Sequence, residues 1–125
     1  MDTEDGLLVP VVKGADKKNL LQITKELNDL AEKARSRKLD LMDMKGGSFT
    51  ITNYGSISGT YGTPVINPGE SAILGLGRAC DRVVLVNNKP ENRKVLPVSL
   101  TFDHQILDGA EAARFLQSLK AILKD

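Results

Sequence analysis

The sequence predicts an α/β fold, a β-sheet with one helix toward each end of the chain. Two segments, 16–38 and 108–123, place apolar residues at helical spacing with charged residues between them. The region between them alternates β-branched runs with Gly, Pro and Asn, which predicts several short strands. The chain has 125 residues, a length at which one domain can bury a core, and we assign a single domain.

The first predicted element is a strand over 6–14, read from "GLLVPVVKG". Pro10 interrupts it and favours an edge or bulged position. The helix that follows is expected from Asp16 to about residue 38. Its charges alternate in sign, which is typical of a solvated helix face and not of a binding patch.

Strands dominate the middle of the chain. The stretch 48–54, "SFTITNY", predicts a strand whose hydroxyls share one face and whose Phe49 and Ile51 share the other. Loops and turns are expected over 55–69, with at most a short strand near "TPVI". The remaining predicted elements are strands at 71–77 and 81–86, a polar turn at 87–93, a strand at 94–102 that completes a hairpin, and the closing helix.

Composition excludes several functions. Seventeen basic and sixteen acidic residues give a net charge of +1, so no strong field favours nucleic acid or an anionic membrane. One cysteine and one histidine argue against a disulfide and a zinc cluster, and we expect no metal. No apolar run is long enough to span a bilayer, and the start lacks signal-peptide features, so we expect the cytoplasm or an organelle matrix.

Three local motifs are rejected or set aside. "GLGRAC" at 75–80 lacks the third glycine of a dinucleotide-binding loop and leads into a strand, and "GSISG" at 55–59 has Ile57 where a nucleophile elbow has serine. Cys80 lies between Arg78 and Arg82, which would favour a thiolate, but we interpret it as buried packing. A Cys80–His104 pair remains an alternative.

The one histidine, His104, stands where the last predicted strand ends. Alternation places it on the apolar side with Phe102, so we expect a partly desolvated ring. Asp108, with Glu111 three residues later, is a capping box for the closing helix. These residues alone favour a structural role for His104.

Three segments resemble one family over essentially the whole chain. "DGLLVPVVKGADKKNLLQI", "GGSFTITNYGSISGTYGTPVINPGESAILGLG" and "LTFDHQILDGAEAARFL" are similar to the dihydrolipoamide acyltransferases, the core components of 2-oxo acid dehydrogenase complexes. The last contains a His-x-x-x-Asp-Gly motif at His104, Asp108 and Gly109. The resemblance implies a two-layer mixed β-sheet with flanking helices, similar to chloramphenicol acetyltransferase and here a partial domain.

The resemblance also implies a reaction. His104 would be the general base that takes the thiol proton of coenzyme A, so that sulfur attacks an acyl-dihydrolipoyl thioester. Thr52 would stabilise the oxyanion, Asp108 would support the histidine loop, and Gly109 would allow a tight turn and close packing where a side chain would intrude. Gln105 stands where the family usually has Arg. The residues that hold coenzyme A are not assigned.

The resemblance implies a homotrimer with active sites between subunits, His104 of one chain facing Thr52 of the next, and trimers joined into a larger core. Decarboxylase and dihydrolipoamide dehydrogenase components would be partners. Residues 1–125 match the carboxy-terminal portion of the catalytic domain, without lipoyl and peripheral-subunit-binding domains, so we expect weak or no activity from this chain alone. The alternatives are a noncatalytic trimeric scaffold and an acetyltransferase for hydroxylated drugs. With Ala110 after the Asp-Gly pair, the segment resembles acetyl- and branched-chain-specific members of the family more than succinyl-specific ones.

Overall fold

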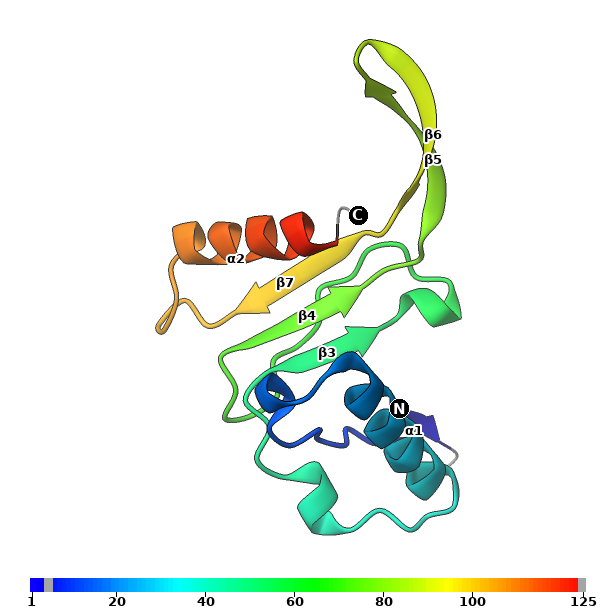
Figure 1. The fold of residues 1–125 in the computed structure, drawn as a ribbon. Helices are drawn as coiled ribbons and strands as arrows, with labels where there is room; N and C mark the ends of the chain where they lie inside the picture. The colour runs from blue at the N-terminus through cyan, green and yellow to red at the C-terminus, as the bar shows by residue number, and fades with distance from the viewer. Residues whose placement is uncertain (4–5, 124–125) are drawn as a thin grey trace. The chain divides into compact units, whose positions relative to one another are not determined.

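A computed structural model describes residues 1–3 and 6–123, which belong to two compact units, Met1–Gly47 and Ser48–Asp125 (Figure 1). Each unit is described by itself. The first is built around one helix, whose residues Leu30 and Ala34 are buried. Its elements are β1 (Asp2–Thr3), β2 (Gly6–Leu7), the 3-10 helix η1 (Ala15–Lys17), α1 (Leu20–Arg35) and the 3-10 helix η2 (Leu41–Met44).

Helix α1 begins four residues later than predicted because Asn19 caps it. The Asn19 side chain accepts a hydrogen bond from the Gln22 N–H at 2.9 Å, and the Gln22 side chain accepts one from the Asn19 N–H at 2.9 Å. This capping box satisfies two N–H groups that the first turn leaves without partners. The predicted end near residue 38 was also too late, because the helix ends at Arg35.

The predicted strand over 6–14 was wrong beyond its first two residues. Only β2, Gly6–Leu7, pairs with another strand, β1. Pro10 has no N–H to give to a strand ladder, and the Val11 N–H donates to the carbonyl of Asp43 at 2.8 Å. The segment after β2 is therefore tied to η2 and not to a sheet.

The second unit holds a three-stranded mixed sheet (Figure 1). Strand β4 (Ala72–Leu76) is central and pairs in parallel with β3 (Thr50–Asn53) and antiparallel with β7 (Val98–Phe102). Helix α2 (Gly109–Ile122) lies along β7, and its Ala112 is buried. The mixed sheet with helices confirms the predicted fold class.

A hairpin extends from this sheet (Figure 1). Strand β5 (Cys80–Val86) pairs antiparallel with β6 (Lys89–Val95) across the turn residues Asn87 and Asn88, both at positive φ as tight hairpin turns require. The predicted turn over 87–93 was therefore too long. The predicted strand over 94–102 is two strands, because Pro97 lies between β6 and β7 and its carbonyl accepts the Gly77 N–H at 2.8 Å.

The register gives the sheet two distinct faces. Thr52, Gly75 and Ser99 lie in one row across the three strands and share the face that we call the hydroxyl face. Tyr54 follows β3 and covers Gly75 on this face, because a Cβ built there would lie 2.7 Å from its ring. The opposite face belongs to α2, since the ring centroids of Phe49 and Phe115 are 5.7 Å apart.

Candidate active site

His104 lies in the turn between β7 and α2. Its side chain is exposed, and its ring centroid is 5.6 Å from that of Phe102, the last residue of β7. The contact with Phe102 agrees with the prediction from strand alternation, which placed the His104 ring on the same side of the strand as Phe102. The predicted desolvation was wrong for the single chain, because the turn carries the imidazole beyond the end of the sheet into solvent.

The turn that carries His104 is folded around Asp103. The Asp103 N–H donates to the Ser71 carbonyl at 2.8 Å, and its carboxylate accepts the Gln105 N–H at 2.9 Å. Its own carbonyl accepts the N–H groups of two further residues, both at 3.0 Å, from Ile106 and Leu107. Our sequence analysis missed Asp103, although aspartate two residues before a free N–H is a recognised turn signal.

Asp108 closes the other end of this turn. Its carboxylate accepts the Glu111 N–H at 2.8 Å, and the Glu111 carboxylate accepts the Asp108 N–H at 3.1 Å. The predicted capping box is confirmed. The expectation for Gly109 was wrong within the chain. A Cβ there would meet nothing within 4 Å and its φ is not positive, because the first position of a helix has ordinary backbone geometry and here faces open space.

The hydroxyls near β3 differ in what they contact. Thr50 donates to the Glu70 carboxylate at 2.6 Å and accepts from the Asn67 side chain at 2.8 Å. The Tyr54 hydroxyl lies 3.2 Å from the hydroxyl of Ser99. The Thr52 side chain, half-buried on the same face, has no hydrogen-bond partner within residues 1–3 and 6–123. Thr52 therefore has a hydroxyl available to a ligand, whereas Thr50 and Tyr54 do not.

Thr52 and His104 do not meet within one chain. The row that contains Thr52 crosses β7 at Ser99, three residues before Phe102. At about 3.3 Å per residue and 4.8 Å per strand, the Cα atoms of Thr52 and Phe102 are roughly 14 Å apart. Alternation also directs the side chains of Ser99 and Phe102 to opposite faces. Within one chain, the strand register therefore does not bring Thr52 next to the end of β7 that leads to His104.

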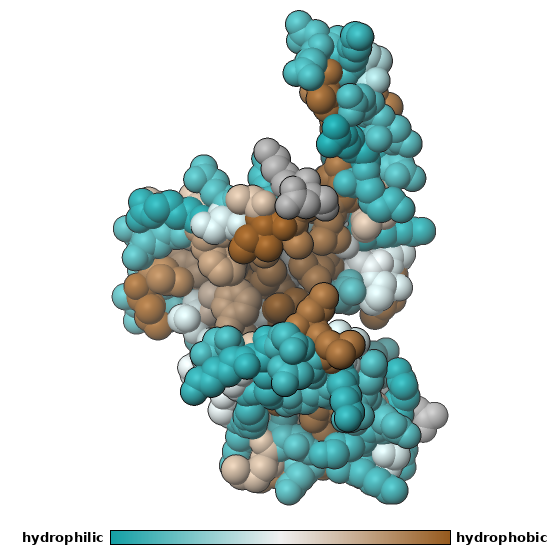
Figure 2. Space-filling model, viewed as in Figure 1, coloured by the Kyte–Doolittle hydropathy of each residue, from teal (hydrophilic) through white to brown (hydrophobic). Residues whose placement is uncertain are grey.

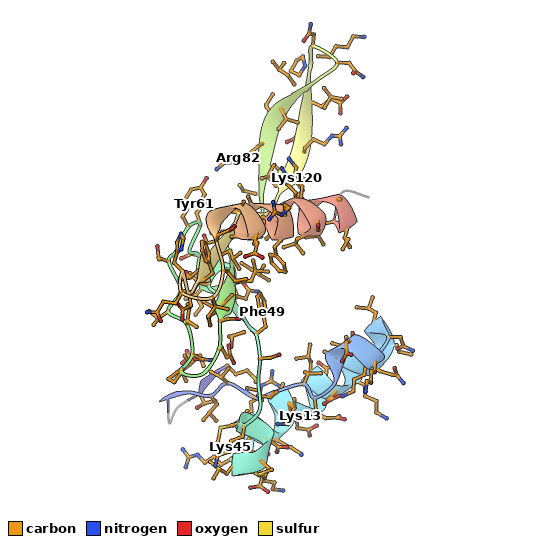
Figure 3. All side chains as sticks on the ribbon, turned by 90° about the vertical axis from the view of Figure 1, so that its left-hand side faces the viewer. Lys13, Lys45, Phe49, Tyr61, Arg82 and Lys120 are labelled. Carbon is orange, nitrogen blue, oxygen red and sulfur yellow. The ribbon has the colours of Figure 1, made fainter. Side chains whose placement is uncertain are left out.

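Cys80 belongs to a separate cluster at the base of the hairpin. It is half-buried, less than the packing interpretation predicted. Arg82 donates to the Tyr61 hydroxyl at 2.9 Å, and Figure 3 shows their side chains directed at each other. Contact with the Cys80 sulfur, and then with Tyr61, raises the pKa of Arg82. In the part of the chain that the structure describes, no hydrogen bond joins Cys80 to His104. The structure therefore does not support the alternative Cys80–His104 pair.

The described residues offer neither a cluster of metal ligands nor a membrane-spanning helix. Within the two described ranges, no three His, Cys, Asp or Glu residues are grouped so that they could hold a metal ion. Among the same residues, no helix combines the length and apolar character needed to cross a bilayer.

The second unit therefore presents an exposed histidine at a strand end and, on its sheet, a threonine hydroxyl without a partner among the described residues. Comparison with known proteins is decisive about the family. The family of 2-oxoacid dehydrogenases acyltransferase (catalytic domain) matches residues 1–125, and this chain belongs to it.

Two relatives show the range of the family. The chain is 50% identical over 124 residues to the dihydrolipoyllysine-residue acetyltransferase component of the pyruvate dehydrogenase complex of Bacillus subtilis. It is 46% identical over 123 residues to the mitochondrial succinyltransferase component of the 2-oxoglutarate dehydrogenase complex of Mus musculus. These matches cover 99% and 98% of this chain but 28% and 27% of the relatives, so the chain spans less than a third of their length.

Solved structures that match this chain support the same family assignment. One comes from a crystallographic and enzymatic study of a serine, a histidine and an asparagine in the catalytic mechanism of Azotobacter vinelandii dihydrolipoamide acetyltransferase. It matches with a TM-score of 0.95 and 48% identity, over 99% of this chain and 51% of that one. The cubic core of a pyruvate dehydrogenase multienzyme complex matches with a TM-score of 0.96 and 47% identity, over 100% of this chain and 51% of that one.

Proposed function

We propose that this chain is the carboxy-terminal portion of a dihydrolipoamide acyltransferase catalytic domain, and that it supplies His104, Thr52 and Asp108 to transfer an acyl group between dihydrolipoamide and coenzyme A. The observation that carries the proposal is that the chain presents both an exposed imidazole and, in β3, one threonine whose hydroxyl is unengaged among the described residues. Neither side chain would have to give up a hydrogen bond of the described chain in order to bind a substrate.

Residue spacing supports the same three residues. In the Azotobacter enzyme the serine precedes the histidine by 52 positions and the asparagine follows it by four. Thr52, His104 and Asp108 have these two spacings. Threonine replaces serine as the hydroxyl donor, and Asp108 replaces asparagine at a position where its carboxylate caps α2.

His104 is the base in the proposed reaction. Its imidazole takes the thiol proton of coenzyme A while the sulfur attacks the thioester carbonyl of acyl-dihydrolipoamide. The tetrahedral intermediate then breaks its bond to the dihydrolipoamide sulfur, which receives the proton from the imidazolium. One carbon–sulfur bond forms and one breaks, so the exchange needs no oxidant and no covalent enzyme intermediate.

Thr52 stabilises the charge that develops on the carbonyl oxygen. Its hydroxyl donates no hydrogen bond to the described protein, so it is free to donate to the oxyanion. Asp108 does not act on the substrate. It fixes the start of α2 and thereby the helix end of the turn that carries His104.

The proposed site forms between subunits. Because the strand register separates Thr52 from the end of β7 that leads to His104, we propose that a neighbouring chain brings the second residue, as in the homotrimer implied by the family. Apolar side chains reach the surface of the second unit around α2 (Figure 2), with Ile122 77% and Ile51 63% exposed. Such surface suits burial against other chains. Trimers would join into a larger core that binds decarboxylase and dihydrolipoamide dehydrogenase components.

The acyl group is proposed to be acetyl or branched-chain, from Ala110 after the Asp-Gly pair. Relatives named for acetyl and for succinyl transfer both match this chain at similar identity, so the choice between them rests on that one position. Rates with acetyl-, isobutyryl- and succinyl-dihydrolipoamide, compared at equal concentration, measure it directly.

Acyl transfer from acetyl-dihydrolipoamide to coenzyme A, measured with the whole protein that contains residues 1–125, tests the proposal. His104→Ala should lower kcat by roughly 10² to 10⁴ and Thr52→Val by roughly 10² to 10³. Thr50→Val is the matched control, since the Thr50 hydroxyl is engaged within the fold. Wild-type activity in His104→Ala would contradict the proposal. A wild-type protein that assembles but transfers no acyl group would favour the scaffold.

A further inference from the structure

At the strand end of the histidine turn, Asp103 binds its neighbours with both its side chain and its backbone. It joins the turn to the sheet through Ser71 and accepts the N–H groups of Gln105, Ile106 and Leu107. We propose that Asp103 is a positioning residue for His104, because its carboxylate folds the turn that holds the imidazole outside β7. This inference rests on the proposed function.

The two ends of the turn are held by different residues. Asp103 holds the strand end, and the Asp108 capping box holds the helix end. Because α2 keeps its cap when Asp103 changes, loss of the Asp103 side chain should loosen the turn without removing the helix. The contact between the rings of Phe102 and His104 would then no longer fix where the imidazole lies.

The carboxylate acts as an acceptor and not as a charge. Its partner is the neutral N–H of Gln105, and it forms no ion pair with any residue in the described ranges. Asparagine has an acceptor oxygen at the same distance from the backbone and can form the same turn. Glutamate keeps the charge but moves the oxygens one methylene further from the Gln105 N–H.

The test compares four variants of the whole protein that contains this chain. Asp103→Ala and Asp103→Glu should lower kcat by about 10- to 100-fold, with the KM for coenzyme A changed less than about threefold, since displacement of a reacting group costs rate more than binding. Asp103→Asn should stay within about threefold of wild type. Asp29→Ala is the control and should match wild type, because Asp29 is an exposed residue of α1 whose side chain has no hydrogen-bond partner among the described residues.

Amide hydrogen exchange over 103–108 gives a second reading that does not need activity. Exchange there should accelerate in Asp103→Ala and Asp103→Glu but not in Asp103→Asn. Should the alanine variant fail to fold, the Asn and Glu pair still decides. Equal loss of kcat in Asn and Glu, or wild-type kcat in Ala, would overturn the positioning role. His104→Ala, run in parallel, separates the two proposals: if it keeps full activity, the proposed function fails.

Discussion

Gly75 leaves room for the Tyr54 ring on the hydroxyl face, and replacing Gly75 with alanine tests this contact. Gly75 pairs with Thr52 on one side and Ser99 on the other. A Cβ at this position would lie 2.7 Å from Cε1 and 3.1 Å from Oη of Tyr54, and 3.3 Å from Cγ of Pro64. The room for the Tyr54 ring to move is limited, because the ring also lies close to Gly59 and Gly62, whose added Cβ atoms would lie 3.0 Å from it.

The magnitude follows from three effects. Overpacking of a filled site costs about 1–3 kcal/mol. Displacement of the ring also breaks the hydrogen bond between Tyr54 and Ser99, worth about 0.5–1.5 kcal/mol. Alanine recovers about 0.5–1 kcal/mol because it restricts the unfolded chain more than glycine does. We expect Gly75→Ala to destabilise the chain by about 2 kcal/mol.

Urea unfolding of the purified chain, followed by circular dichroism at one fixed protein concentration, measures this difference. Gly109→Ala is the matched control. Its Cβ would meet nothing within 4 Å at the first position of α2, so it should stabilise by about 0.4–1 kcal/mol. A Gly75→Ala variant as stable as wild type would refute the reasoning, because it would show that the Tyr54 ring yields at no cost.

Two further predictions concern the first unit. Asn19→Ala should destabilise α1 by about 1 kcal/mol in urea unfolding, because the capping box is lost. Asn28→Ala is the control and should not have this effect, because Asn28 is exposed within the helix and caps nothing. Equal effects of the two variants would contradict the role of the cap. The backbone N–H of Asp40 donates a hydrogen bond to the Asp43 carboxylate and holds the pKa of Asp43 below its ordinary value of 3.8. The ionised Asp43 side chain therefore stabilises the fold above pH 3.8, and this stabilisation is lost as the pH falls through the pKa of Asp43 in the folded chain. Asp43→Asn should therefore differ from wild type in thermal unfolding most near neutral pH and least in acid; a difference that grew in acid would contradict this sign.

Much of the fold could be predicted from local patterns. The alternation in 48–54 placed Thr50 and Thr52 on one face, and Asp108 with Glu111 predicted the start of α2. The predicted start of α1 at Asp16 was wrong although Asn19 and Gln22 form a readable cap, because the start was placed four residues before Leu20, the first apolar residue of the helical pattern. The single strand over 94–102 was wrong because alternation continues through Pro97, where the ladder does not.

The candidate site needed contacts between distant residues. Alternation alone cannot separate Thr52 from Thr50, and the distinction comes from Glu70, which engages Thr50 from 20 residues away. The exposure of His104 depended on how far the turn carries it beyond β7, which strand alternation does not specify. Asp103 could have been found, since its turn is local, but the motif at His104 and Asp108 drew the interpretation to the other end of the turn.

The central claim is that one active site takes His104 from one chain and Thr52 from another. Mixed assemblies test it most directly: His104→Ala and Thr52→Val proteins are dissociated, combined in equal amounts, reassembled and assayed for acyl transfer to coenzyme A. If two chains share each site, random mixing leaves both residues native in roughly a quarter of the sites, and about that share of wild-type activity should return. Activity no higher than that of the two variants assembled separately would contradict the shared site.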